Sequence, residues 1–151
     1  RLIPARMADT TDQARLAAAR EANAEGMAAL RAGNAALAAE AFRRATAHDP
    51  LAGALWRNLA HALRDSGDDK GELAILNQAL DLDRTDFVAQ LRKAQNLQRI
   101  GDEEEALSAW TGALRFRLDA SGAKLLVSRR QDQRRYWREP VSPRSGYAIA
   151  N

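Results

Sequence analysis

The chain has 151 residues, of which 46% are hydrophobic and only 5% aromatic, and it carries 23 lysines and arginines against 20 aspartates and glutamates. This length suits one domain with tails, and the absence of cysteine from the sequence excludes disulfides and cysteine-ligated zinc. The alanine-rich, aromatic-poor composition favours closely packed helices over strands, so the sequence predicts an all-α protein.

Residues 1–10 are expected to form an N-terminal tail. Residues 1–6 precede a candidate initiator, Met7, and can be an addition to the natural chain. The sequence has no apolar run of the roughly 18 to 20 residues that cross a bilayer, and no apolar signal-peptide core. Since nothing in the chain demands an oxidising compartment, we expect a cytoplasmic protein without membrane contacts.

The sequence from residue 19 to residue 120 repeats itself with a period of 34. This offset aligns three glycines, three alanines and three large apolar residues: Gly33, Gly67 and Gly101; Ala45, Ala79 and Ala113; Phe42, Leu76 and Trp110. Small residues at fixed places, with a large apolar residue three before the last alanine, are typical of helix-turn-helix repeats. We therefore predict three pairs of helices, at about 19–52, 53–86 and 87–120.

These three units resemble the tetratricopeptide repeat (TPR) family. The residues that carry the resemblance are Gly26, Gly33, Ala38, Phe42, Ala45 and Pro50 in the first unit, Trp56, Leu59, Ala60, Gly67, Leu76 and Ala79 in the second, and Ala94, Gly101, Ala106, Trp110 and Ala113 in the third. The resemblance implies a right-handed α-solenoid. The units depart from the family pattern at Ala22, Glu72, Arg84, Gln90 and Leu118.

Short polar motifs predict where helices begin and end. Each of the pairs Gly67-Asp68 and Gly101-Asp102 combines a residue that tolerates positive φ with a side chain that can cap the next helix. The pairs Asp69 with Glu72, Asp102 with Glu105 and Thr10 with Gln13 have the spacing of capping boxes. Trp56 falls on the packing face of its helix, so we interpret it as a structural residue rather than an exposed ligand contact.

The resemblance implies a concave surface lined by the first helix of each unit. The helix face opposite the buried one contains Asn23, Met27, Leu30, Arg31, Arg57, Asn58, His61, Arg64, Leu91, Arg92, Gln95 and Arg99. Arginine can bind a carboxylate through two hydrogen bonds, and a side-chain amide can bind the backbone of an extended peptide. We interpret this surface as a groove for an acidic or C-terminal peptide, with an ordinary solvated face as the alternative.

Arg57, Asn58, Arg92 and Arg99 are expected to make the main polar contacts. Some TPR proteins bind the C-terminal acids of heat-shock chaperones through a two-carboxylate clamp, which the resemblance would place at Asn23, Met27, Asn58, Val88 and Arg92. Only Asn58 and Arg92 have the residue type that this clamp needs. We therefore expect a partner protein or peptide that is not held by a standard clamp.

Nothing in the sequence predicts catalysis. His48 and His61 are the only histidines, and neither has a second histidine or a cysteine for a metal, nor a nucleophile at a triad-like spacing. Three acids at 103–105 are explained by the favourable dipole at a helix start. The sequence has no glycine-rich phosphate loop and no GxSxG elbow. We expect no enzyme activity, no metal and no cofactor.

The C-terminal part is basic, with seven lysines and arginines against two acids over residues 121–151. Residues 121–139 are predicted to form a helix whose Leu125, Leu126 and Val127 cap the last unit, because the ends of a solenoid need a cover. Within it, "SRRQDQRRYWREP" clusters arginines around two aromatic residues, a pattern that can bind nucleic acids but usually marks a solvated face. Residues 140–151 are expected to be extended.

The favoured function is a non-catalytic interaction scaffold, and two alternatives stay open. The segments "LWRNLAHALRDSGD" and "DFVAQLRKAQNLQRIGD" look like the TPR region ahead of the catalytic domain in bacterial aspartyl/asparaginyl β-hydroxylases, which use 2-oxoglutarate and iron(II). Their metal site needs histidines with a carboxylate, and this chain has no HxD motif, so it would be only an adaptor region. Nucleic-acid binding by the basic segment is the second and less favoured alternative. Self-association is compatible with all three.

Overall fold

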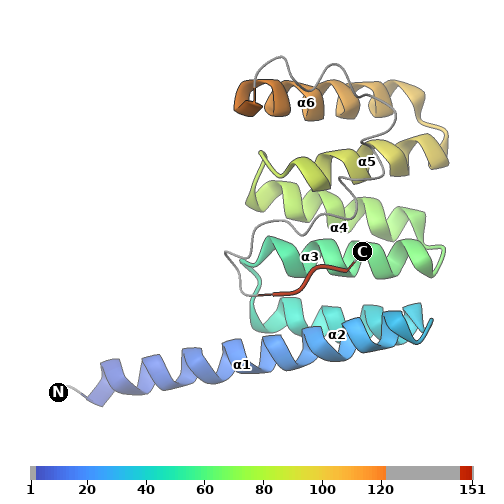
Figure 1. Ribbon diagram of the computed structural model, residues 1–151. Coiled ribbons are helices and arrows are strands. Elements are labelled where there is room, and N and C mark those ends of the chain that lie inside the picture. The colour runs from blue at the N-terminus through green and yellow to red at the C-terminus, as the bar shows by residue number, and fades with distance from the viewer. Residues whose placement is uncertain (1–2, 122–146, 151) are drawn as a thin grey trace.

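The computed structural model describes residues 3–121 and 147–150, and the side chains of 9–115 and 147–150. Within this part the chain is helical, without strands, and its elements are α1 (Ile3–Arg31), α2 (Ala35–His48), α3 (Gly53–Asp65), α4 (Asp69–Leu82), α5 (Phe87–Ile100) and α6 (Glu103–Ser121). The helices stack in chain order from α1 to α6 (Figure 1), and each packs mainly against the helices before and after it. This arrangement confirms the all-α class and the α-solenoid of three helix pairs. In the described part of the chain, no helix has the length and apolarity needed to span a membrane.

Helix α1 begins earlier than the sequence pattern indicated. It starts at Ile3, so residues 3–10, which we expected as a tail, belong to its first turns. Pro4 is compatible with this start, since proline in a first helical turn loses no hydrogen bond. Thr10 and Gln13 therefore lie inside α1 and do not form a capping box.

The turns inside the three pairs share one motif, a glycine followed by a helix-capping residue, which recurs every 34 residues. Gly33, Gly67 and Gly101 have φ of 78°, 82° and 92°, a left-handed conformation that glycine adopts without strain. The residue after each glycine caps the next helix by accepting a hydrogen bond from a backbone N–H, as Asn34 does from Leu37, Asp68 from Gly71 and Asp102 from Glu105. The cap of α4 is thus Asp68, and the capping box that we assigned to Asp69 and Glu72 is wrong.

Small residues let the paired helices approach closely. A Cβ atom added to Gly26 of α1 would lie 2.5 Å from the ring of Phe42 in α2, which is itself fully buried. Trp56 is half-buried between the cores of the first and second pairs, and its indole N–H donates to the Pro50 carbonyl at 2.8 Å. Trp56 is therefore a packing residue, as its place in the helical pattern predicted.

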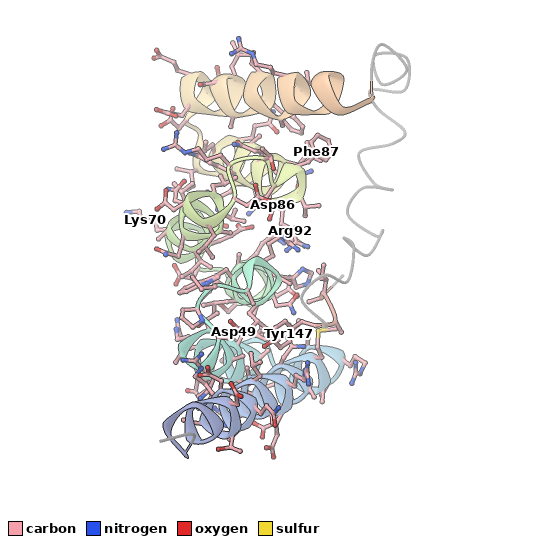
Figure 2. The ribbon with its side chains drawn as sticks, turned by 90° about the vertical axis from the view of Figure 1, so that its left-hand side faces the viewer. Asp49, Lys70, Asp86, Phe87, Arg92 and Tyr147 are labelled. Carbon is pink, nitrogen blue, oxygen red and sulfur yellow. The ribbon has the colours of Figure 1, made fainter. Side chains whose placement is uncertain are left out.

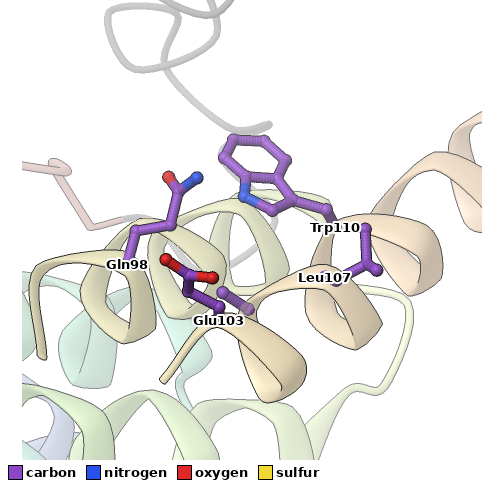
Figure 3. A pocket seen from close by; sticks show the side chains of 5 residues that line it. Gln98, Glu103, Leu107 and Trp110 are labelled. Carbon is purple, nitrogen blue, oxygen red and sulfur yellow. The ribbon is translucent and has the colours of Figure 1, made fainter. Parts of the chain in front are cut away.

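The end of the described stack is open. Gln98, Glu103, Ala106, Leu107 and Trp110 line a cleft of about 510 Å³ between the end of α5 and α6 (Figure 3), and Leu107 is 68% exposed. Helix α6 ends at Ser121. The capping helix expected over 121–139, with its basic run, lies outside the described residues, as do residues 140–146 of the expected extended tail.

Gly26 and Gly112 form a matched pair that tests this packing. Gly26→Ala should lower the free energy of unfolding by about 1–3 kcal/mol, because the new methyl group overlaps the Phe42 ring. Gly112 of α6 has no atom within 4 Å of an added Cβ, so Gly112→Ala should raise that energy by about 0.5–1 kcal/mol through helix propensity. Urea unfolding followed by circular dichroism measures both. A Gly26→Ala protein at least as stable as the wild type would contradict the close approach.

Candidate functional site

A stretch near the C-terminus lies along the helices that carry the expected groove. Residues 147–150 run across α3 (Figure 1), and Tyr147 and Arg92 lie on the same side of the stack, opposite Lys70 of α4 (Figure 2). Four described residues hydrogen-bond this segment: Asn23, Asp49, Asn58 and Arg92. The face formed by α1, α3 and α5 therefore already carries a piece of extended chain, and this face is called the groove below.

Asn58 of α3 makes the central contacts of this groove. Its side-chain N–H groups donate to the Ala148 carbonyl at 2.7 Å and to the Asn23 amide oxygen at 2.9 Å, while its own amide oxygen accepts from the Ala150 N–H at 2.5 Å. Asn23 of α1 adds a longer contact of 3.5 Å to the Ala148 carbonyl. Asn58 is fully buried. Its amide therefore satisfies one donor and its acceptor with backbone groups of the segment, the carbonyl of Ala148 and the N–H of Ala150.

Arg92 of α5 binds the last described residue of the segment. One terminal nitrogen of its guanidinium donates to the Ala150 carbonyl at 3.3 Å, and the other donates to the Arg57 carbonyl at 3.0 Å. Burial, followed by the nearby charges of Arg64 and Arg57, lowers the pKa of Arg92 to about 10. Arg92 is therefore still a cation at neutral pH, and it is held at one end of the segment.

The side chains of Tyr147 and Ile149 pack into an apolar cluster at the other end. This cluster, here called the alanine pocket, consists of Ala19, Ala22, Ala45, Ala52, Ala54 and Leu55, from α1, α2, α3 and the α2–α3 turn. Tyr147 is 7% exposed, and its hydroxyl donates to the Asp49 carboxylate at 2.7 Å. Burial and this carboxylate raise the pKa of Tyr147 to about 12, so the hydroxyl keeps its proton and remains a donor.

Two of the arginines that we expected to contact a peptide form ion pairs within the stack. Arg57 forms a buried ion pair with Asp86, which also caps α5 by accepting from the Ala89 N–H. Arg99 pairs with Glu72 and, at 3.3 Å, with Asp69 of α4. Both charges therefore face carboxylates of this chain, and in the structure neither arginine hydrogen-bonds the described residues 147–150.

Glu72 explains one departure from the family pattern. It is 1% exposed and accepts hydrogen bonds from Asn96 at 2.8 Å and from Arg99. Burial raises the pKa of Glu72, and these two donors oppose that shift. The signal in the sequence for these contacts was an acid, Glu72, at a position that the repeat pattern usually gives to a small residue. Asn96 and Arg99 of the next helix, α5, were the available partners for this acid.

The remaining predicted groove residues differ in exposure. Arg31 is exposed, whereas Arg64 and Gln95 are half-buried. His61 is 6% exposed, and its Nε2 lies 3.2 Å from the Asp65 carboxylate.

Asp49 and the alanine pocket were not predicted from the sequence. Alanines on a helix face are normally interpreted as core residues, and Asp49 has the sequence context of an ordinary turn residue. Within the described residues, no group of three or more potential ligands is placed to hold a metal ion.

His61 should make the stability of the fold depend on pH. Burial, followed by the Arg92 charge, lowers its pKa from 6.5 to about 4. A lowered pKa means that the unfolded chain takes up the proton first, so the stabilisation is present above pH 6.5 and is lost as the pH falls toward 4.

Between pH 7 and pH 4.5 the wild type should therefore lose about 2 kcal/mol more unfolding free energy than His61→Gln. Urea titrations at the two pH values measure this difference. His48→Gln is the control, since His48 is exposed. Equal losses in the wild type and His61→Gln would show that His61 is not held neutral.

Comparisons with known proteins give the fold. No family model matches the chain, and no curated protein matches it. The complex of the TPR2B domain of yeast Sti1 with pHsp70 is 22% identical over 80% of this chain and 94% of that chain, with a TM-score of 0.67. The second TPR of Spaghetti (RPAP3), bound to the HSP90 peptide SRMEEVD, is 21% identical over 71% and 98%, with a TM-score of 0.65. The crystal structure of MamA is 16% identical over 64% and 56%, with a TM-score of 0.62.

Proposed function

Because the chain has the fold of tetratricopeptide-repeat domains, we propose that it is a non-catalytic scaffold that binds an extended segment of a partner protein in the groove of α1, α3 and α5. The observation that carries this proposal is the pair of backbone hydrogen bonds at Asn58, which donates to the Ala148 carbonyl and accepts from the Ala150 N–H. Solved structures of the fold support the class of function, since one is a complex with pHsp70 and another holds the HSP90 peptide SRMEEVD.

The chemistry of Asn58 suits any extended peptide. A primary amide offers donors and an acceptor on one rigid plane, and here they meet a carbonyl and an N–H that any residue except proline could supply. Backbone hydrogen bonds of this kind give affinity, while pockets for alternate side chains give specificity. A buried amide without a partner is costly, so an empty groove would need water at Asn58.

A preference for acidic peptides is argued from the position of Arg92. Its guanidinium is a cation at neutral pH and donates to the Ala150 carbonyl at the end of the segment. A carboxylate of the partner near this position would gain a charge-assisted hydrogen bond. The adaptor region of a β-hydroxylase would be compatible with the same groove, and it remains an alternative within this class of function.

Asn58→Asp tests the groove with little change of shape. The groove must first be accessible, so we define an open-groove variant of the full chain with Tyr147→Ala and Ile149→Ser, which removes the two side chains in the alanine pocket. An array of random heptapeptides should contain peptides that this variant binds, and Asn58→Asp in the same background should weaken them at least tenfold, because a carboxylate repels the carbonyl that the amide binds.

Asn77→Asp is the matched control, since Asn77 is exposed on α4, and circular dichroism confirms that each variant is helical. Peptides that bind Asn58→Asp and the open-groove variant equally well would place binding elsewhere and overturn the proposal. An array without any bound peptide would overturn it as well.

Arg92→Gln tests the acidic preference separately. Peptides with Asp or Glu at the end that follows the Asn58-bound residues should lose about tenfold in affinity, which corresponds to about 1.4 kcal/mol. Neutral peptides should change less. Lys93→Gln removes the same charge from the neighbouring, half-buried position and should have little effect. Equal loss for acidic and neutral peptides would refute a charge-based preference and leave backbone binding intact.

A further inference from the structure

The segment in the groove shows which side chains the groove accepts. We propose that the groove selects segments in which a tyrosine is followed two residues later by an aliphatic side chain, and that residues 147–150 are an internal ligand of this kind which a partner must displace. This inference rests on the proposed function and specifies its ligand. It follows from how Tyr147, Ile149 and Ala150 are held.

The alanine pocket has the shape and the polarity for a tyrosine. Five of its six residues are alanines, so their short side chains leave room for a ring between α1, α2 and α3. Asp49 lies at the C-terminus of α2, and its backbone N–H bonds the Ala45 carbonyl. The Asp49 carboxylate accepts the hydrogen bond of the Tyr147 hydroxyl. A phenylalanine would fill the same space but would leave this carboxylate without that donor.

The segment alternates between two kinds of contact. The side chains of Tyr147 and Ile149 enter the alanine pocket, while the backbone of Ala148 and Ala150 bonds Asn58 and Arg92. Ala148 is exposed, so any residue would fit there. Ala150 is 1% exposed, so its place requires a small residue. The pattern that the groove recognises is therefore tyrosine, any residue, aliphatic, small.

Attachment to the same chain makes the segment a competitor of any partner. Every hydrogen bond that it makes with Asn58 and Arg92 uses a group that a partner backbone would need. A tethered ligand binds at an effective concentration that does not depend on the concentration of the protein. A partner must therefore match the segment in the pocket as well as in the backbone contacts.

The test uses the full chain and a labelled peptide of residues 145–151, SGYAIAN, in fluorescence anisotropy. The open-groove variant should bind this peptide at least tenfold more tightly than the wild type, whose groove is occupied. The peptide with phenylalanine in place of tyrosine should bind the open-groove variant about tenfold more weakly. Adding Asp49→Ala to the open-groove variant should abolish this difference, because the partner of the hydroxyl is gone.

Asp83→Ala in the open-groove background is the matched control. Asp83 is the residue at the same place after α4, where its backbone N–H likewise bonds a helix carbonyl. This variant should keep the discrimination between the two peptides. Circular dichroism and the binding of peptides from the random array show that the groove of each variant is folded.

Three results would overturn the inference. Equal binding of SGYAIAN by the wild type and the open-groove variant would show that the segment does not compete. Equal affinity for the tyrosine and phenylalanine peptides, with binding still lost in Asn58→Asp, would remove the selectivity and leave the proposed function standing. Failure of SGYAIAN to bind the open-groove variant, while array peptides do bind it, would likewise refute only this inference.

Discussion

The buried side-chain amide of Asn58 links three parts of the molecule that are far apart in the sequence. It bonds Asn23 of the first repeat, it belongs to the second, and it holds the backbone of Ala148 and Ala150. A fully buried amide must have its donors and its acceptor satisfied, so the spacing of α1 and α3 and the path of the extended segment constrain each other.

The same relation recurs one repeat later with different chemistry. Asn58 donates to Asn23, 35 residues earlier, and Arg92 donates to the Arg57 carbonyl, also 35 residues earlier. Along α1, α3 and α5, the first helices of the three repeats, polar side chains thus join each repeat to the one before it. Since Arg57 is also paired with Asp86, which caps α5, part of the basic character of this face serves contacts within the stack. Residues 147–150 therefore meet a surface that is less charged than its composition indicates.

Local signals in the sequence were sufficient for the fold. The motif of a glycine followed by a helix-capping residue recurs every 34 residues, and the turns lie where this motif predicts them. The start of α1 was missed because Thr10 and Gln13 have the spacing of a capping box, although the residues between Pro4 and Thr10 contain no helix breaker. Helical periodicity placed Asn58 and Arg92 on one face of the stack, but it gave no information about which carboxylates would face Arg57 and Arg99. Asp49 escaped notice because its role depends on a tyrosine 98 residues away.

The residues that hold residues 147–150 are spread over all three repeats. In a solenoid whose units contact mainly their neighbours, stability is distributed along the stack, and the terminal unit can fray alone. The alanine pocket and Asp49 belong to the first repeat and the beginning of the second, whereas Arg92 belongs to the third. Fraying of α5 and α6 would release the end of a bound segment that Arg92 holds, while its tyrosine stayed in the alanine pocket. Dissociation would therefore proceed stepwise, beginning at the Arg92 end.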